Sequence, residues 1–187
     1  MKPTWFDKFA CTPGRLTLME GAFLYAAALA ASRIASSGNM LELGTFRGRS
    51  TCAIAAACKQ VDMRLTTIDN YSQGACPSVG ESSEDVVRAN LEDAGVADVV
   101  TIVNGNSHEY QPLAGLSFIF IDAAHDWESV VADCDTWWKD LQMHGILAFH
   151  DGSHPGVAEA VEALGKKHAM RPIAHVGSII AFEKTGT

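Results

Sequence analysis

The sequence has few charged residues and no long apolar run, and each shortage excludes a class of protein. Charged residues make up 19% and hydrophobic residues 48% of the 187 residues, a balance that is typical of a globular chain and excludes a disordered one. The longest apolar run, residues 22–31, is too short to span a bilayer and follows Glu20 too far into the chain for a signal peptide. The length predicts one domain, residues 1–187, in which an N-terminal arm and a helix (residues 1–38) precede the core.

Basic residues and paired cysteines are also scarce. There are 14 Lys and Arg against 22 Asp and Glu, which gives a net charge of −8 and argues against general binding to nucleic acid or to an anionic membrane. A base or a tRNA as substrate stays open. The five cysteines form no CxxC pair, and an odd number without a secretion signal fits reduced thiols and a cytoplasmic location.

Short apolar segments alternate with helical patterns along the chain. The predicted strands are residues 40–43, 64–68, 99–103, 116–121, 145–149, 172–175 and 178–182. The predicted helices are residues 17–35, a helix from residue 50, residues 86–94, a helix that carries Val130, Cys134, Trp137 and Leu141, and residues 155–167. This order predicts an α/β fold: a Rossmann-like, doubly wound, mostly parallel seven-stranded sheet with an antiparallel C-terminal strand pair. Such sheets bind ligands at the carboxyl ends of their strands.

The turn after the first predicted strand departs from the dinucleotide fingerprint. Gly44 is followed by Thr45 and Phe46, so the second glycine of GxGxxG is missing, although Gly48 keeps the close turn into the helix. Glu42 would repel a pyrophosphate and attract a cation. S-adenosylmethionine carries an ammonium and a sulfonium and no phosphate, so it suits this turn. The alternative is an ordinary tight strand-to-helix turn.

Two further strand ends carry groups that suit an adenosyl ligand. Asp69 ends the second strand, where a carboxylate can accept both ribose hydroxyls; the alternative is that Asp69 and Asn70 initiate a turn. Asn106 and Ser107 follow the third strand and can bond the edge of adenine, or Ser107 can cap a short helix.

The fourth and fifth strands end in acids and histidines. Asp122 follows the fourth strand, with His125 three residues later, and His150 and Asp151 follow the fifth. Such a cluster of titratable groups at strand ends favours a functional site. Asp122 can also contact only the cofactor, His125 can cap the helix that starts near Asp126, and Asp151 can cap the helix after Pro155.

These motifs, taken in order, resemble the class I S-adenosylmethionine-dependent methyltransferases, and most closely the branch that methylates hydroxyls of small molecules. The resemblance rests on residues 42–50, Asp69, residues 121–125 and residues 145–151, and covers about residues 39–165. It implies S-adenosylmethionine as cofactor, a small hydroxylated molecule as substrate, and a homodimer as a typical assembly. The cofactor-binding residues that it implies are Glu42, Gly44, Thr45, Gly48, Ser50, Asp69, Asn70, Asn106, Ser107 and Asp122.

Some members of that branch bind a divalent cation. By position, the resemblance carries this role to Asp122, His150 and Asp151, and the catalytic role to Asp122, His125 and His150, with His125 as the base. His150 stands where many metal-dependent members have an acid. Magnesium prefers oxygen ligands and imidazole suits softer ions, so Mg²⁺, Mn²⁺ and a softer metal all stay open, as does a base without metal.

Three other functions remain as alternatives. One is a dinucleotide-dependent oxidoreductase, against which the missing glycine and Glu42 argue. Another is a non-catalytic adenosyl-binding module. The third is a metal-centred hydrolase or oxygenase that uses Asp122, His125, His150 and Asp151. In the preferred function, the loop of residues 71–83 and the N-terminal arm cover the substrate pocket, and Trp127 either lines it or packs on its own helix.

Overall fold

The computed structural model describes residues 4–34, 38–72, 80–110, 113 and 115–186, and their seven strands form one sheet. The strand order is β3-β2-β1-β4-β5-β7-β6, and β7 runs antiparallel to both of its neighbours. The strands are β1 (Asn39–Leu43), β2 (Arg64–Asp69), β3 (Val100–Asn104), β4 (Leu116–Ile121), β5 (Leu141–Phe149), β6 (Met170–Val176) and β7 (Ile179–Lys184). The predicted fold, with its antiparallel C-terminal pair, is confirmed.

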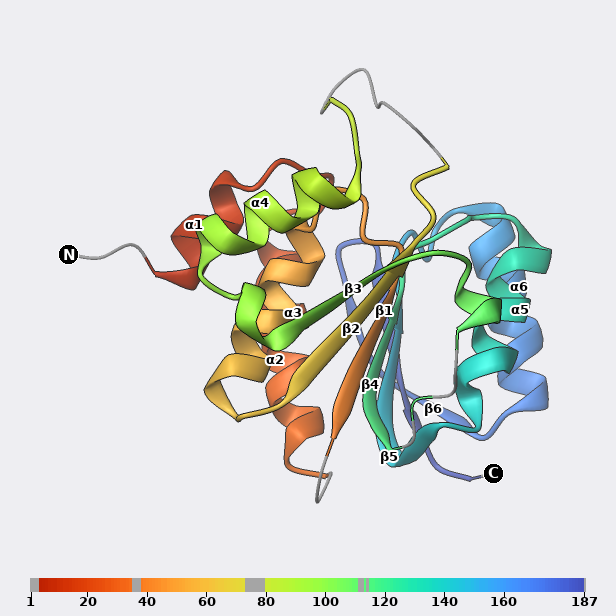
Figure 1. The fold of residues 1–187 in the computed structure, drawn as a ribbon. Coiled ribbons are helices and arrows are strands. Elements are labelled where there is room, and N and C mark those ends of the chain that lie inside the picture. The colour runs from red at the N-terminus through yellow and green to blue at the C-terminus, as the bar shows by residue number, and fades with distance from the viewer. Residues whose placement is uncertain (1–3, 35–37, 73–79, 111–112, 114, 187) are drawn as a thin grey trace.

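Helices cover both faces of the sheet, as Figure 1 shows. On one face lie α1 (Trp5–Cys11), α2 (Leu18–Ser32), α3 (Arg49–Gln60) and α4 (Glu84–Ala94), and on the other lie α5 (Trp127–Trp138) and α6 (Pro155–Lys167). Two short 3₁₀ helices, Ala97–Val99 and Ser107–Glu109, flank β3. Within the described ranges, no helix combines the length and the apolar character needed to cross a membrane.

The alternation of side chains along β4 explains why both faces need cover. All six residues of β4 are buried. Phe118 and Phe120 belong to the core beneath α2 and α3, whereas Ile119 and Ile121 belong to the core beneath α5 and α6. A central parallel strand buried on both faces is therefore apolar at nearly every position.

The N-terminal segment is a helix and not the arm that the sequence predicts. Thr4 and Asp7 form a capping box that starts α1, and Phe9 in this helix is fully buried. Trp5 stacks on Tyr25 of α2 with ring centroids 4.2 Å apart. The prediction of an arm is wrong because the helix is too short to have a clear apolar period, and its aromatic residues gain their stability from tertiary packing.

The fifth strand is longer than predicted. Leu141 begins β5 and does not belong to α5, which ends at Trp138. Lys184 Nζ donates to the carbonyls of Trp138 and Leu141 across this junction, at 2.8 Å each. The helical spacing of Leu141 was therefore coincidental.

Three features of the sequence analysis lie outside the described residues. They are the predicted helix end at residues 36–37, Cys76 and much of the predicted loop 71–83.

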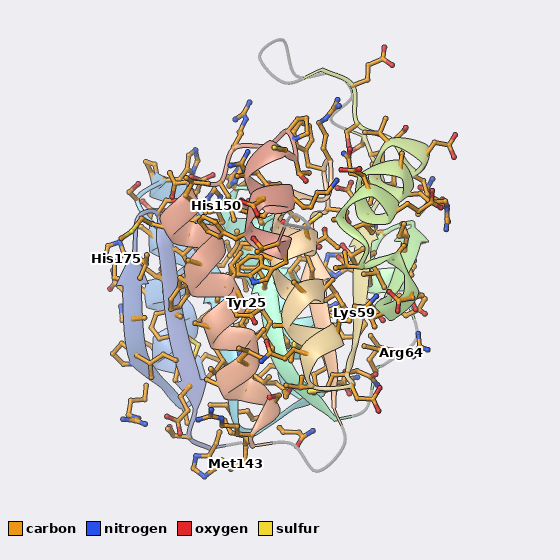
Figure 2. The ribbon with its side chains drawn as sticks, turned by 90° about the vertical axis from the view of Figure 1, so that its left-hand side faces the viewer. Tyr25, Lys59, Arg64, Met143, His150 and His175 are labelled. Carbon is orange, nitrogen blue, oxygen red and sulfur yellow. The ribbon has the colours of Figure 1, made fainter. Side chains whose placement is uncertain are left out.

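The strand order places a crevice at one end of the sheet. The chain runs outward from β1 to β2 and β3 and then returns to β4 beside β1, and such a reversal opens a binding site at the carboxyl ends of β1 and β4. Figure 2 shows His150, just after β5, at that end of the molecule, and Met143, near the start of β5, at the opposite end.

Candidate active site

A cavity of about 440 Å³ lies at the carboxyl ends of β1, β2, β3, β4 and β5, within the usual range for a small-molecule site. Its walls include most of the residues that the sequence predicts: Gly44, Thr45, Ser50, Asp69, Asn70, Asn106, Ser107, Asp122, His125, His150 and Asp151. Glu42 and Gly48 are buried and are not among the residues that line the cavity. The fold therefore gathers residues from five strand ends around one volume.

Gly44 lets the first turn touch the loop after β4. Its φ is +87°, and a Cβ at this position would lie 2.0 Å from the carbonyl oxygen of Asp122. The N–H of Asp122 in turn donates to the carbonyl of Leu43 at 2.8 Å. Only glycine combines this backbone conformation with so close an approach, so the contact fixes the cavity floor between β1 and β4.

Glu42 is fully buried behind the turn. The hydroxyls of Thr51 and Thr67 donate to its Oε2 at 2.5 and 2.7 Å, which ties β1 to α3 and to β2. Burial raises the pKa of Glu42 to about 7, against hydrogen bonds from Ser50, Thr51 and Thr67 that lower it. The sequence predicts that Glu42 attracts the positive charge of the cofactor; a carboxylate at this depth acts on the cavity through the turn that it supports.

Asp69 organises the glycine turn. Its Oδ2 accepts from the backbone N–H groups of Thr45 and Phe46, both at 2.8 Å, and its Oδ1 accepts from the N–H of Tyr71 at 2.7 Å. Phe46 and Tyr71 have φ values of +49° and +53°, which are uncommon for side chains of this size and recur at functional sites. Each oxygen has two lone-pair sites, so Oδ1 keeps capacity for a ligand hydroxyl.

Two histidines and two acids meet at the ends of β4 and β5. His150 Nδ1 lies 3.1 Å from Asp122 Oδ1 and 3.3 Å from Asp151 Oδ2. His125 Nε2 lies 3.0 Å from Asp151 Oδ2 and 3.9 Å from Asp122 Oδ1. Asp151 has a φ of +50°, a left-handed conformation that aspartate tolerates better than most residues. The structure thus brings together all four residues that the sequence singles out here.

His150 carries the positive charge of this cluster. Burial lowers its pKa, but the hydrogen bond and charge of Asp122 and the charges of Asp151 and Glu20 outweigh burial and raise it to about 9. Burial also raises the pKa of Asp122, against the hydrogen bond from His150. We place the proton on His150, because three carboxylates surround the imidazole.

His125 has a different environment. Its Nε2 is buried, and the contact with Asp151 lacks hydrogen-bond geometry, so the atom has no hydrogen-bond partner among the described residues. One donor atom each from Asp122, His125 and Asp151 lies within 4.8 Å of the others. An orphaned imidazole nitrogen that faces two carboxylates fits a divalent cation. The set of metal ligands predicted from the sequence contains His150 in place of His125. Both ring nitrogens of His150 already face carboxylates, so His125 is the better candidate for the third ligand.

Two buried acids near the cavity escape the sequence analysis. Glu20 completes the capping box of α2, accepts from the N–H and hydroxyl of Ser178, and lies 3.8 Å from His150. Its T-x-x-E spacing with Thr17 is a readable capping signal, but nothing local indicates its distant partners. Asp133 lines the cavity from α5 and stands among apolar residues of helical period, where a buried acid has no sequence signal.

The alternative roles for the turn residues are resolved by their hydrogen bonds. Asn106, and not Ser107, caps the short helix after β3, and Asp126, and not His125, caps α5. His154 is the N-cap residue of α6 without a side-chain hydrogen bond. Trp127 is 41% exposed and is not among the residues that line the cavity.

Solved structures share this fold at low sequence identity. The O-methyltransferase NovP is 17% identical, with a TM-score of 0.75 over 89% of this chain and 80% of its own. The cofactor-bound protein Rv0187 from MTB is 22% identical, with a TM-score of 0.71 over 96% of this chain and 87% of its own. An O-methyltransferase from Bacillus cereus in complex with SAH is 20% identical, with a TM-score of 0.69 over 98% and 92%.

A sequence family provides the stronger comparison. The model of a family described as a methyltransferase domain matches residues 41–152, the segment from β1 through the residues that follow β5. This match contains the glycine turn, Asp69, Asp122, His125, His150 and Asp151, and it confirms the resemblance seen in the sequence. The chain belongs to this methyltransferase-domain family.

Proposed function

We propose that this protein transfers a methyl group from S-adenosylmethionine to a hydroxyl of a small molecule, and that a divalent cation held by Asp122, His125 and Asp151 assists the transfer. One observation carries the proposal. The three converging donors open into the same cavity as the glycine turn and Asp69, so a cofactor and an activated acceptor would meet there. The SAH bound to the relative from Bacillus cereus supports the choice of cofactor.

The cavity offers a place for each part of the cofactor. The free acceptor capacity of Asp69 Oδ1 suits a ribose hydroxyl, and Asn106 and Ser107 lie where a base attached to that ribose would reach. The backbone of Gly44 and Thr45 and the N-terminal end of α3, which starts after Gly48, suit the carboxylate of the amino-acid end. The sulfonium of S-adenosylmethionine supplies an electrophilic methyl group, so the chain has mainly to orient the two reactants.

The donor set also suggests which metals suit the site. Two carboxylates and one imidazole favour ions such as Mn²⁺, Fe²⁺ or Zn²⁺ over Mg²⁺, which prefers an all-oxygen environment. A bound cation would lower the pKa of a coordinated acceptor hydroxyl. His150 contacts both Asp122 and Asp151, and the side chain of Asp151 is 41% exposed, so this carboxylate can pass the acceptor's proton to water.

Calorimetry tests the cofactor directly. Titration of the purified protein with S-adenosylhomocysteine should give saturable binding with one site per chain, and NADH should give none. Saturable NADH binding without binding of S-adenosylhomocysteine would replace the proposal with the oxidoreductase alternative. Replacement of Asp69 by Ala should abolish the signal, and replacement of Asp98, which pairs with Lys59 on the surface away from the cavity, should leave it unchanged.

Turnover separates an enzyme from a binding module. A panel of small phenols, catechols and sugar hydroxyls, assayed with S-adenosylmethionine and Mn²⁺, should show release of S-adenosylhomocysteine with at least one acceptor. If the protein binds S-adenosylhomocysteine but methylates neither these acceptors nor amine and thiol analogues, a non-catalytic module replaces the proposal.

A further inference from the structure

The outer face of α2 is apolar along its whole length. Between Arg15 and Arg33 the sequence contains one charged residue, Glu20, and its side chain is buried. A helix at the surface of a globular protein usually carries charged and polar side chains on the face away from the core, whereas a helix that is apolar all round is usually buried. The composition of α2 is therefore that of a helix with a partner on both sides.

The exposed residues of α2 form one strip. They are Leu18, Met19, Ala22, Ala26 and Ala30, and Arg33 and Ile34 continue the strip past the end of the helix. Met19 is 72% exposed, Leu18 47% and Ile34 40%, so the strip has large apolar side chains at both ends and small ones between them. In Figure 2 the helix lies between the strand that carries His175 and the helix that carries Lys59. The described part of the chain leaves the whole strip open to solvent.

The strip matches its own reverse. If two copies of α2 pack antiparallel about a two-fold axis that passes beside Ala26, the positions that meet are those equally far from Ala26 in the two directions. Leu18 of one copy then meets Ile34 of the other, and Ala22 meets Ala30. Apolar ends meet apolar ends, and the small residues at the centre allow the two helices to approach closely. A two-fold interface needs this self-complementarity.

The remaining pair fits the same arrangement. Met19 of one copy meets Arg33 of the other, and these residues lie seven positions before and after Ala26, at the spacing that brings side chains to one seam of two packed helices. The methylene stem of an arginine covers an apolar neighbour while its guanidinium stays in water. The antiparallel arrangement also places the positive end of each helix dipole beside the negative end of the other. Apart from Arg33, the strip offers an unlike partner no charge to recognise.

We propose that the strip on α2 is the interface of a homodimer, in which the helices of two copies pack antiparallel about a two-fold axis at Ala26. The interface does not depend on the proposed function. A helix of 15 residues is about 22 Å long and, with its side chains, about 10–12 Å wide, so the strip alone offers roughly a third of the ~800 Å² per copy that a standard interface buries. The half-buried rings of Phe23 and Tyr25 flank the strip at neighbouring helical positions and add to this area. We expect a reversible dimer with a Kd of about 1–100 μM.

Sedimentation velocity over a range of protein concentrations tests the interface. The wild-type protein should change from monomer to dimer as its concentration rises through the micromolar range. Ala26→Glu places two like charges against each other at the axis and should weaken the dimer by about 100-fold or more. Glutamate is a strong helix former, so this variant should fold, which thermal unfolding checks. Ala158→Glu makes the same change at an exposed position of α6, on the opposite face of the sheet, and should dimerise like the wild-type protein.

A pair of opposite charges tests the register. Ala22→Lys and Ala30→Glu, made one at a time, each place a charge opposite an alanine of the other copy and should weaken the dimer by about 10-fold or more. Made together, they place a lysine opposite a glutamate on both sides of the axis, and the Kd should return to within about 10-fold of the wild-type value. Within one helix the two positions are too far apart to touch, so this recovery reports a contact between copies. The pair also decides the question if Ala26→Glu does not fold.

Each other outcome contradicts a part of this proposal. A wild-type protein that stays monomeric at about 100 μM, the weak end of the expected range, would refute the homodimer. A dimer that resists Ala26→Glu, or that Ala158→Glu weakens equally, would place the interface away from α2. Single variants that weaken the dimer without recovery in the double variant would refute the antiparallel register at Ala26. The oligomeric state is measured without cofactor, so a failure of the proposed function would leave these results unaffected.

Discussion

The imidazole of His150 lies with its Nδ1 3.1 Å from Oδ1 of Asp122, which joins the carboxyl ends of β5 and β4 by a charged contact. The same nitrogen lies 3.3 Å from Asp151. The imidazolium of His150 thus contacts two carboxylates, and the same two oxygens also face Nε2 of His125. We infer that His150 sets the distance between the carboxylates of Asp122 and Asp151, and that His125 contacts the reacting groups.

Replacement of His150 by Leu should therefore disturb the positions of the carboxylates more than it disturbs the fold around the cofactor cavity. Without the imidazolium, Asp122 and Asp151 repel each other and one of them turns away or takes up a proton. We expect kcat to fall by about 100-fold, comparable with the loss of a positioned acid–base group, with the affinity for S-adenosylhomocysteine changed less than about threefold. His175→Leu, at an exposed position of β6 away from the cavity, is the matched control and should keep its kcat. An unchanged kcat in His150→Leu would show that the carboxylates need no cation between them.

Removal of metal provides a second test. Dialysis against EDTA should abolish methyl transfer, and Mn²⁺ should restore more activity than Mg²⁺, because the donor set includes an imidazole. The binding of S-adenosylhomocysteine should survive the dialysis. Asp151→Ala should be inactive at any Mn²⁺ concentration that restores the wild-type protein. Full activity in EDTA would instead assign deprotonation of the acceptor to His125 acting alone, and His125→Ala would then lower kcat by about 100- to 10,000-fold.

The buried Glu42 should make stability depend on pH. Its pKa is raised from 4.5 to about 7 in the folded protein, so the unfolded chain loses its proton first as the pH rises. The folded state is then penalised progressively from pH 4.5 to 7, by roughly 3 kcal/mol at the upper end. Glu42→Gln cannot ionise and should lack this part of the pH dependence.

Denaturant unfolding of the two proteins at several pH values measures this contribution. Relative to the wild-type protein, Glu42→Gln should gain about 1 kcal/mol or more between pH 4.5 and 8, since the amide can still accept from Thr51 and Thr67 while it carries no buried charge. If the difference in the free energy of unfolding between the two proteins stays constant with pH, then Glu42 has the same pKa in the folded and unfolded chain.

The sequence was informative where local chemistry and strand order act together. The apolar pattern of β4 and the acids at the ends of β2 and β4 predict the sheet and place Asp69 and Asp122 at one edge, because parallel strands end on the same side. The role of Gly44 in the turn could also be predicted, because this turn needs a positive φ and a close approach to a neighbour.

Tertiary contacts explain what the sequence did not reveal. The helix at Trp5–Cys11 is too short for a periodic signal and depends on contacts such as that with Tyr25. The choice between His125 and His150 as the third metal ligand depends on whether both ring nitrogens already face carboxylates. In His150 the second nitrogen faces Glu20, which lies 130 residues earlier in the chain. The contact of Asp133 with the cavity could not be predicted for a similar reason, because only the fold brings this residue beside Ser107.

Glu20 gives the last prediction, because it joins three parts of the molecule. It caps α2 with Thr17, holds the turn before β7 through Ser178, and lies 3.8 Å from His150. Burial raises its pKa, but the hydrogen bonds from Thr17 and Ser178 outweigh burial and lower it to about 2. The Glu20 carboxylate therefore stabilises the folded state above pH 4.5, and this stabilisation is lost as the pH falls toward 2.

Glu20→Gln should lower the free energy of unfolding at pH 7 by about 2 kcal/mol, the usual loss for hydrogen bonds to a buried charge, and should lower kcat because the ring of His150 loses a charged neighbour. Thr17→Ala removes the cap of the same helix without touching His150, and it should cost about 1 kcal/mol while kcat stays unchanged. If the two variants lose kcat equally, Glu20 serves the helix alone. If only Glu20→Gln loses kcat, the start of α2 is coupled through His150 to the carboxylates that face the acceptor.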